Sequence, residues 1–191
     1  MKVLVFSTSP NQDGLTAACA GAALAGVRAA GGEADEVRLN DLEVGKCQAC
    51  DNGWGTCRVE HNCQVKDDFQ DVHQRSLEAD ALILVTPVYW GEMSESAKAF
   101  TDRLRRCEAT RRQESRLSGK PVIAVAAAGG SGGGMITCLA SMERWIEHVG
   151  LRKFDLIPVN RWSREYKLLT ISAAAEAMTR EWVQARAGAA S

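Results

Sequence analysis

Four short, nearly uninterrupted apolar runs mark the chain, at residues 3–6, 81–85, 122–126 and 154–159. Strands that are covered on both faces of a parallel sheet have this pattern. A fifth stretch, residues 34–39, alternates polar and apolar positions, which predicts a strand nearer the edge of the same sheet. We therefore expect five strands.

Helical periodicity fills the intervals between these runs. Apolar residues recur every three to four positions in five segments, which begin near Leu15, Phe69, Ala97, Ile136 and Ile171. Each segment is predicted to be a helix that packs its apolar face inward. In the third segment the charged residues are expected to face solvent; they are Lys98, Asp102, Arg103 and Arg105.

The alternation of strands and helices from end to end predicts an α/β fold. Right-handed crossovers then give one five-stranded parallel sheet with helices on both faces, which is a three-layer sandwich. Five strands in a chain of 191 residues favour the flavodoxin-like strand order over larger six-stranded folds. We expect a single domain over residues 1–191, with a Cys-rich insertion at 40–66 and a fraying tail at 187–191.

Composition excludes several classes of partner. The formal net charge is −1, and a nucleic-acid or membrane-surface binder needs a concentrated basic excess. The one basic cluster, residues 103–116, alternates with Glu108 and Glu114, which is typical of a solvated helix end and loop. We therefore expect neither nucleic acid nor membrane as a partner.

The cysteine content bears on the compartment. The first apolar run is too short for the core of a signal peptide, and no other run approaches a membrane span. We expect a cytoplasmic protein, in which the seven cysteines are mostly thiols or metal ligands rather than disulfides.

Three segments that follow strands are unusual, and in a parallel sheet all three lie at the edge where ligands bind. The first is rich in hydroxyls and runs into a helix, whose N-terminus offers free N–H groups to a phosphate. It lacks the Gly-Lys-Ser/Thr of an NTPase loop. An ordinary capped helix with nothing bound is the alternative. The candidate binding residues are Ser7, Ser9, Asn11, Gly14, Leu15 and Thr16.

The second segment places two aromatic residues at a strand end, where they can stack on a flat heterocycle. Backbone amides around Tyr89 and Gly91 are suited to hydrogen-bonding the polar edge of such a ring. The alternative is that the two aromatic side chains pack against the insertion. The candidate residues are Thr86, Pro87, Val88, Tyr89, Trp90 and Gly91.

The third segment is glycine-rich, which allows close approach of a ligand to the backbone. It contains no Gly-x-Gly-x-x-Gly and does not follow the first strand, so it is not a dinucleotide fingerprint. A mobile surface loop is the alternative. The candidate residues are Ala128, Gly129, Gly130 and Gly134.

These motifs resemble those of a known group: the NAD(P)H-dependent FMN reductase and iron–sulfur flavoprotein branch of the flavodoxin-like superfamily. The resemblance spans roughly residues 2–150. Ser9-Pro10 through Gly14-Leu15-Thr16 looks like the family's phosphate loop, and Thr86 to Gly91 with Met93-Ser94 looks like its isoalloxazine loop. Gly129-Gly130 resembles the loop on the other side of the ring. The chain departs from the family at Asn11-Gln12-Asp13, where relatives often carry basic residues.

The resemblance implies FMN as cofactor. It implies an oxidoreductase that accepts hydride from NADH or NADPH and reduces a small-molecule electron acceptor, such as a flavin or a quinone. It also implies a homodimer or homotetramer. An electron carrier that relays electrons through FMN, with or without a [4Fe–4S] cluster, is the second hypothesis, and a flavin-binding redox sensor is a third. Because a flavin supplies its own redox chemistry, we assign no catalytic side chain.

Four cysteines, Cys47, Cys50, Cys57 and Cys63, fall close together in the insertion. Their placement resembles the cluster segment of iron–sulfur flavoproteins, although Gly53 occupies the usual third cysteine position. Four thiolates can hold a [4Fe–4S] cluster or a tetrahedral zinc, where His61 can replace one thiolate, and thiols that pack or react are the remaining alternative. The other cysteines, Cys19, Cys107 and Cys138, lie on apolar helix faces and are expected to be core residues.

Overall fold

A computed structural model describes the backbone of residues 1–189 and the side chains of residues 1–185. The strands are β1 (Lys2–Ser7), β2 (Glu33–Arg38), β3 (Ala81–Tyr89), β4 (Glu92–Met93), β5 (Pro121–Ala128) and β6 (Arg152–Asn160). The α-helices are α1 (Leu15–Ala29), α2 (Phe69–Glu78), α3 (Glu95–Glu108), α4 (Met135–His148) and α5 (Arg164–Ala189). The expected alternation of strands and helices is confirmed.

Five parallel strands form the sheet in the order β2-β1-β3-β5-β6, which is the flavodoxin-like order. The sixth strand, β4, is short and pairs antiparallel with the end of β3. β3 and β5 run further than the apolar runs predict, so Thr86 to Tyr89 and Ala128 are strand residues rather than loop residues. They remain in strands because the pairing of β3 with β5, of β3 with β4 and of β5 with β6 continues beyond the apolar runs.

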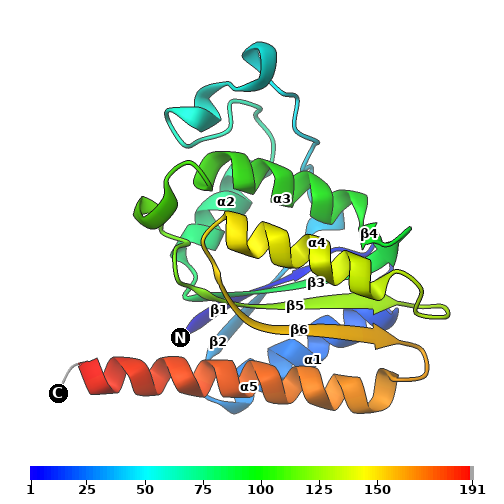
Figure 1. The fold of residues 1–191 in the computed structure, drawn as a ribbon. Coiled ribbons are helices and arrows are strands. Elements are labelled where there is room, and N and C mark those ends of the chain that lie inside the picture. The colour runs from blue at the N-terminus through cyan, green and yellow to red at the C-terminus, as the bar shows by residue number, and fades with distance from the viewer. Residues whose placement is uncertain (190–191) are drawn as a thin grey trace.

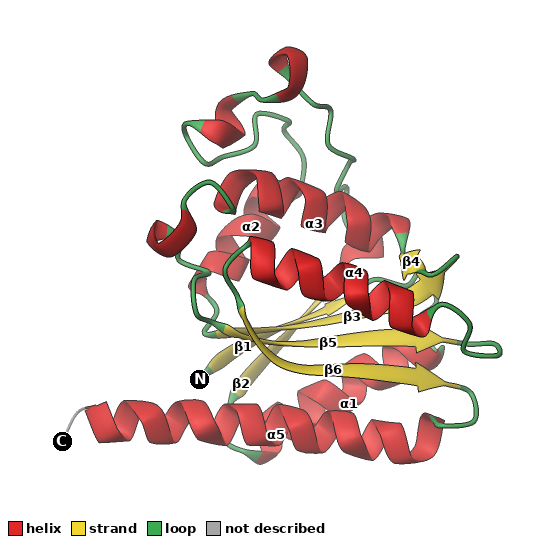
Figure 2. Cartoon of the chain, viewed as in Figure 1, coloured by secondary structure: helices red, strands yellow, loops and turns green. Residues whose placement is uncertain are grey.

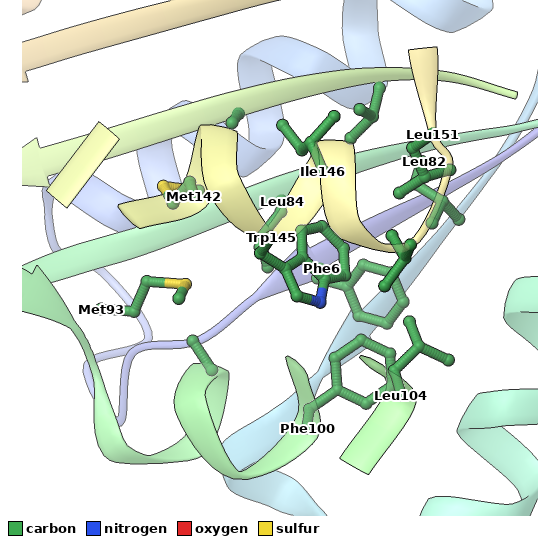
Figure 3. Close-up of a cluster of buried hydrophobic side chains, with 14 of the residues drawn as sticks. Phe6, Leu82, Leu84, Met93, Phe100, Leu104, Met142, Trp145, Ile146 and Leu151 are labelled. Carbon is green, nitrogen blue, oxygen red and sulfur yellow. The ribbon is translucent and has the colours of Figure 1, made fainter. Parts of the chain in front are cut away.

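Helices cover both faces of the sheet and form the two outer layers of the sandwich (Figure 1). α1 and α5 pack on one face, and α2, α3 and α4 pack on the other. The face under α3 and α4 buries the aromatic core, where the ring centroids of Phe6 and Phe100 are 4.8 Å apart. Figure 3 shows these rings beside Trp145, whose indole N–H donates to the carbonyl of Thr101 (3.1 Å).

Three side-chain orientations differ from expectation. Arg103, expected to face solvent, is 1% exposed, because residues 40–66 fold over that side of α3. Glu108, expected in a solvated helix end, is also buried, because α2 and residues 109–118 cover it. Ile136, expected to face inward, is 70% exposed, because it lies on the outer side of the first turn of α4, whose inner side buries Cys138.

The segment 40–66, called here the cysteine segment, is irregular apart from short 3₁₀ turns that include Asp51–Gly53 and Thr56–Arg58. Figure 2 shows it as a long excursion of green loop and short red helical turns beyond α3, on the side of α3 away from the sheet. Of the expected tail, residues 187–189 are helical in α5, and 190–191 lie outside the described residues. Among the described helices, none combines the length and the apolarity that a membrane crossing requires.

Candidate functional site

The loops after β1 and β3 are tied together at the carboxyl edge of the sheet. The backbone N–H of Thr8 donates to the carbonyl of Val85 (3.1 Å), which continues the pairing of the two strands. The hydroxyl of Ser94, which caps α3, donates to the carbonyl of Thr8 (2.8 Å). These bonds place the first two candidate segments side by side, as the strand order predicts.

The first segment offers groups that lack partners inside the protein. The hydroxyl of Ser7 is buried and has no hydrogen-bond partner among the described residues. The hydroxyl of Ser9 accepts the N–H of Asn11 (3.1 Å), which shapes the turn. Gly14 is the extended N-cap of α1 and supplies no side-chain cap, so the N–H groups of the first turn, at Leu15 and Thr16, are open to a ligand. The arrangement suits an anion.

The second segment is a two-residue β-hairpin. Val88 pairs with Met93 and Tyr89 with Glu92. Trp90 and Gly91 form the tip with φ of 50° and 81°. A left-handed conformation is strained for tryptophan, and such strain gathers at ligand sites.

The exposure of the hairpin residues separates ligand-facing groups from supporting ones. Trp90 is fully exposed and Tyr89 is 40% exposed. Thr86 is buried instead, and its hydroxyl accepts the N–H of Ser94 (3.0 Å). Thr86 thus supports the hairpin through its bond to Ser94, while the side chains of Tyr89 and Trp90 are exposed to solvent.

The third segment meets the hairpin backbone to backbone. A Cβ on Gly134, whose φ is 80°, would lie 2.6 Å from the Cα of Gly91. Together with Trp90 and Thr137 these glycines line a cleft of about 460 Å³. A Cβ on Gly129 or Gly130 would meet no atom within 4 Å, which leaves open space above the loop. The three candidate segments are therefore contiguous.

Replacing Gly134 with alanine is expected to destabilise the protein by about 1–3 kcal/mol, because the position needs a positive φ and the new methyl would strike the backbone of Gly91. The matched control is Gly133→Ala, where the Cβ meets only the Ser131 hydroxyl at 3.8 Å. Thermal unfolding of both variants measures the difference. Equal melting temperatures would contradict the close approach.

These features fit FMN. Its phosphate needs N–H and hydroxyl donors, which Ser7 and the open first turn of α1 supply. Its flat ring needs an uncovered aromatic surface and a slot beside small residues, which Trp90, Gly129 and Gly130 supply.

All four cysteines of the cysteine segment line one small cavity. Arg103 and Arg106 from α3 complete its wall. Within the described residues, no three His, Cys, Asp or Glu side chains are arranged to hold a metal ion, so the sulfur atoms surround a common space without forming a preformed ligand set. The donor set is all thiol, which suits an iron–sulfur cluster or zinc.

His61 is not part of this cavity. Its Nδ1 lies 3.1 Å from the carbonyl oxygen of Cys107, so it is engaged elsewhere. Burial raises the pKa of Cys19 and Cys138 to about 12, which keeps these two as neutral core thiols. Cys107 is likewise buried, and the prediction that these three cysteines are core residues is confirmed.

A groove of about 520 Å³ joins the two regions. Its walls come from the cysteine segment through Lys46 and Cys47, from the hairpin through Tyr89 and Trp90, and from the start of α3 through Glu95. A second cleft, of about 320 Å³, continues from it between α3 and α4. One cysteine and the aromatic hairpin thus share one solvent-open space.

A buried polar network supports the C-terminal end of α3. His73 Nε2 lies 2.7 Å from Glu108 Oε1, and the Ser115 hydroxyl donates to Glu108 Oε2 (2.5 Å). Burial acts to raise the pKa of Glu108, but the hydrogen bonds from His73 and Ser115 outweigh it and hold this pKa below 4.5. The carboxylate is therefore charged in the folded protein at neutral pH.

Because the pKa of Glu108 is lowered in the folded protein, its contribution to stability is expected to depend on pH. A carboxyl whose pKa is lowered on folding stabilises the protein above its unfolded pKa and loses that effect as pH falls through the folded pKa. We expect Glu108→Gln to cost about 1.5–3 kcal/mol at pH 7. The cost shrinks as pH falls below about 4.5, the ordinary pKa of this group. Urea unfolding across pH measures it, with the exposed Glu114→Gln as control. A cost that does not change with pH would contradict the assignment.

Several residues of the site escaped sequence reasoning. Arg103 lines the cysteine cavity, Lys46 lines the groove and Thr137 lines the cleft beside Gly134. Nothing in the sequence around these residues distinguishes them from ordinary surface residues.

Known proteins share this sequence pattern. A family profile described as NADPH-dependent FMN reductase matches residues 1–153. The chain is 30% identical over 151 residues to an iron-sulfur flavoprotein of Methanosarcina thermophila, covering 79% of this chain and 75% of that protein. It is 34% identical over 105 residues to an iron-sulfur flavoprotein of Methanocaldococcus jannaschii, covering 55% of this chain and 52% of that one.

Solved structures share the fold. An NAD(P)H:quinone oxidoreductase from Methanothermobacter marburgensis superposes with a TM-score of 0.71 at 17% identity, over 92% of this chain and 94% of that chain. A WrbA-like flavodoxin protein from Agrobacterium tumefaciens gives 0.61 at 15% identity, over 96% and 98%. With the flavodoxin-like fold established and the sequence match extending over most of its length, the chain belongs to the NADPH-dependent FMN reductase and iron–sulfur flavoprotein family.

Proposed function

We propose that the protein is an electron-transfer oxidoreductase that uses FMN at the carboxyl edge of the sheet and a [4Fe–4S] cluster at the four cysteines. The observation that carries this proposal is the groove in which Cys47 faces the same space as Tyr89 and Trp90. The names of the relatives, which are iron-sulfur flavoproteins, support it. When bound, FMN supplies hydride and single-electron chemistry, and the cluster supplies single-electron transfer.

The chain's own residues divide the work of holding FMN. Ser7, Ser9 and the first turn of α1 offer donors to the phosphate. Trp90 at the strained hairpin tip offers a ring surface, and the backbone at Gly91 offers an N–H at the polar edge of the flavin. The open space above Gly129 and Gly130 admits the ring without a steric clash.

The cysteine segment supplies four thiolates from unequal spacings. Cys47 and Cys50 keep the two-residue gap of the family pattern, and Cys57 takes the role left open by Gly53. The presence of Cys57 on the same cavity wall supports this replacement. A cluster is favoured over zinc because the relatives bear the iron-sulfur name.

A hydride donor of the NAD(P)H type is the second part of the proposal. The cleft between α3 and α4 carries Arg105 and Arg144, which make no ion pair among the described residues, beside the paired Lys98 and Asp102. Such a cationic wall suits the phosphates of a dinucleotide, and the cleft adjoins the groove through Met93 and Lys98. The electron acceptor is a flavin, a quinone or a similar small molecule, consistent with the open groove.

Anaerobic reconstitution with FMN, iron and sulfide tests the proposal. We expect about one flavin and about four irons per chain, with an electron paramagnetic resonance signal from the reduced cluster. NADPH and NADH are then added separately, and bleaching of the flavin absorbance reports hydride acceptance. Flavin without iron would overturn the cluster, and absence of bleaching by either nucleotide would overturn the donor.

A further inference from the structure

Arg103 on α3 binds both ends of the cysteine segment. Its Nη1 donates to the carbonyl of Gly45 (3.0 Å) and to Asp67 Oδ2 (2.6 Å). Its Nη2 donates to the carbonyl of Val65 (3.1 Å) and to the Sγ of Cys63 (3.3 Å). One planar guanidinium therefore connects the beginning of the segment, just before the first cysteine, to its end at the last cysteine.

Two aspartates also join the two ends of the cysteine segment, residues 43–45 and residues 63–68, which together are called its neck. Asp67 Oδ2 accepts the N–H of Gly45 (2.9 Å), and Asp68 Oδ2 accepts the N–H of Glu43 (2.7 Å). The N–H of Asp68 returns a bond to the carbonyl of Glu43 (3.0 Å). The neck is thus held by bonds that involve no metal, and Arg103 lies at its centre.

The neck depends on charge as well as on shape. Arg103 is 1% exposed and stacks over the ring of Phe69, 4.2 Å from its centroid. Burial acts to raise the pKa of Asp67, but the hydrogen bonds from Arg103, Gly45 and Phe69 together outweigh it and hold this pKa below its ordinary value. A buried guanidinium needs such a partner, because an unpaired buried charge is strongly destabilising. The fork geometry matters too, since lysine offers no two parallel donors.

We propose that Arg103 is a positioning residue for the iron–sulfur site: it closes the neck of the cysteine segment and holds the Cys63 sulfur through a hydrogen bond. This inference rests on the proposed function for the group that is held, while closure of the neck stands on the contacts alone. A donor aimed at a ligand sulfur stabilises the more negative, reduced cluster and so raises its reduction potential.

The chain offers a matched pair of variants. Arg103→Lys keeps the charge and loses the fork. Arg106→Lys alters another arginine of α3, which lines the same cavity and lies over Trp54 (4.2 Å) but makes no hydrogen bond to the segment among the described residues. Asp67→Asn is a second, nearly isosteric test, because it weakens the Arg103 contact without removing the guanidinium.

Hydrogen exchange on metal-free protein tests closure of the neck. We expect the amide of Gly45 to exchange at least about tenfold faster in Arg103→Lys than in Arg106→Lys, since the lysine loses the paired charge-assisted hydrogen bonds that hold Gly45 and Asp67 together. Asp67→Asn is expected to change exchange in the same direction. Equal rates in the two lysine variants would overturn the inference.

A redox titration on reconstituted protein tests the contact to Cys63. We expect a lower cluster potential in Arg103→Lys than in Arg106→Lys, because only Arg103 donates to the Cys63 sulfur, and equal potentials in the two variants would overturn the positioning role. Wild-type protein that takes up no iron would instead refute the proposed function, and the exchange measurement on metal-free protein would still decide whether Arg103 closes the neck.

Discussion

Replacing Cys57 with alanine is expected to abolish the iron–sulfur cluster while leaving FMN binding intact. Cys57 shares its cavity with the three other cysteines of the segment, and a cluster with only three thiolate ligands is held poorly. Iron content and the absorbance of the cluster are expected to fall below about a tenth of the wild-type value. Flavin content depends on the carboxyl edge of the sheet, which this substitution does not alter, and it is expected to equal that of the wild type.

The control for this change is Cys19→Ala. Cys19 is buried between α1 and the sheet, on the face opposite the cysteine segment. Both variants lose one thiol, so a difference in iron content isolates the position of the sulfur. Full iron retention in Cys57→Ala would mean that the third ligand comes from elsewhere, and the assignment of Cys57 would fall.

Replacing Ser7 with alanine is expected to weaken FMN binding by about 10- to 150-fold, which corresponds to a lost hydrogen bond of about 1.5–3 kcal/mol to a charged group. The hydroxyl of Ser7 is buried without a partner, so its removal costs the ligand-free protein nothing and relieves an unsatisfied polar group. The expected combination is weaker binding at an unchanged or slightly raised melting temperature. Fluorescence titration and calorimetry measure the two quantities.

Ser76→Ala is the matched control, because the hydroxyl of Ser76 is also buried but donates within its own helix to the carbonyl of Val72 (2.7 Å). It is expected to leave FMN affinity unchanged. A Ser7→Ala protein that binds FMN as wild type does would show that this hydroxyl does not face the phosphate.

The sheet and its helices could be predicted because their signals are local. Continuous apolar runs such as residues 81–85 can be buried only in a covered sheet, and helical stripes such as that of α3 fix which side packs. The topology alone predicted that the three loops lie close together, since parallel strands end at the same edge of the sheet. The contact of Gly91 with Gly134 confirms that two of these loops meet.

The cysteine segment could not be predicted in the same way. Its path is set by contacts with residues that are distant in sequence, and no hydrophobic periodicity in the segment predicts those contacts. Arg103 has the sequence surroundings of a solvated helix residue, yet it is buried because a segment that precedes it by about 40 residues folds over it. Glu108 is buried for the same kind of reason, through His73 on another helix. Polar residues whose partners are distant in sequence carry no local signal of burial.

The most direct test of the account compares FMN with riboflavin, which differs only by the phosphate. Fluorescence titration of the flavin-free protein is expected to show FMN binding at least about a hundredfold tighter, because charge-assisted bonds from Ser7 and the first turn of α1 act on the phosphate alone. Equal affinities for the two flavins, or no binding of either, would contradict the assignment of the carboxyl edge as an FMN site.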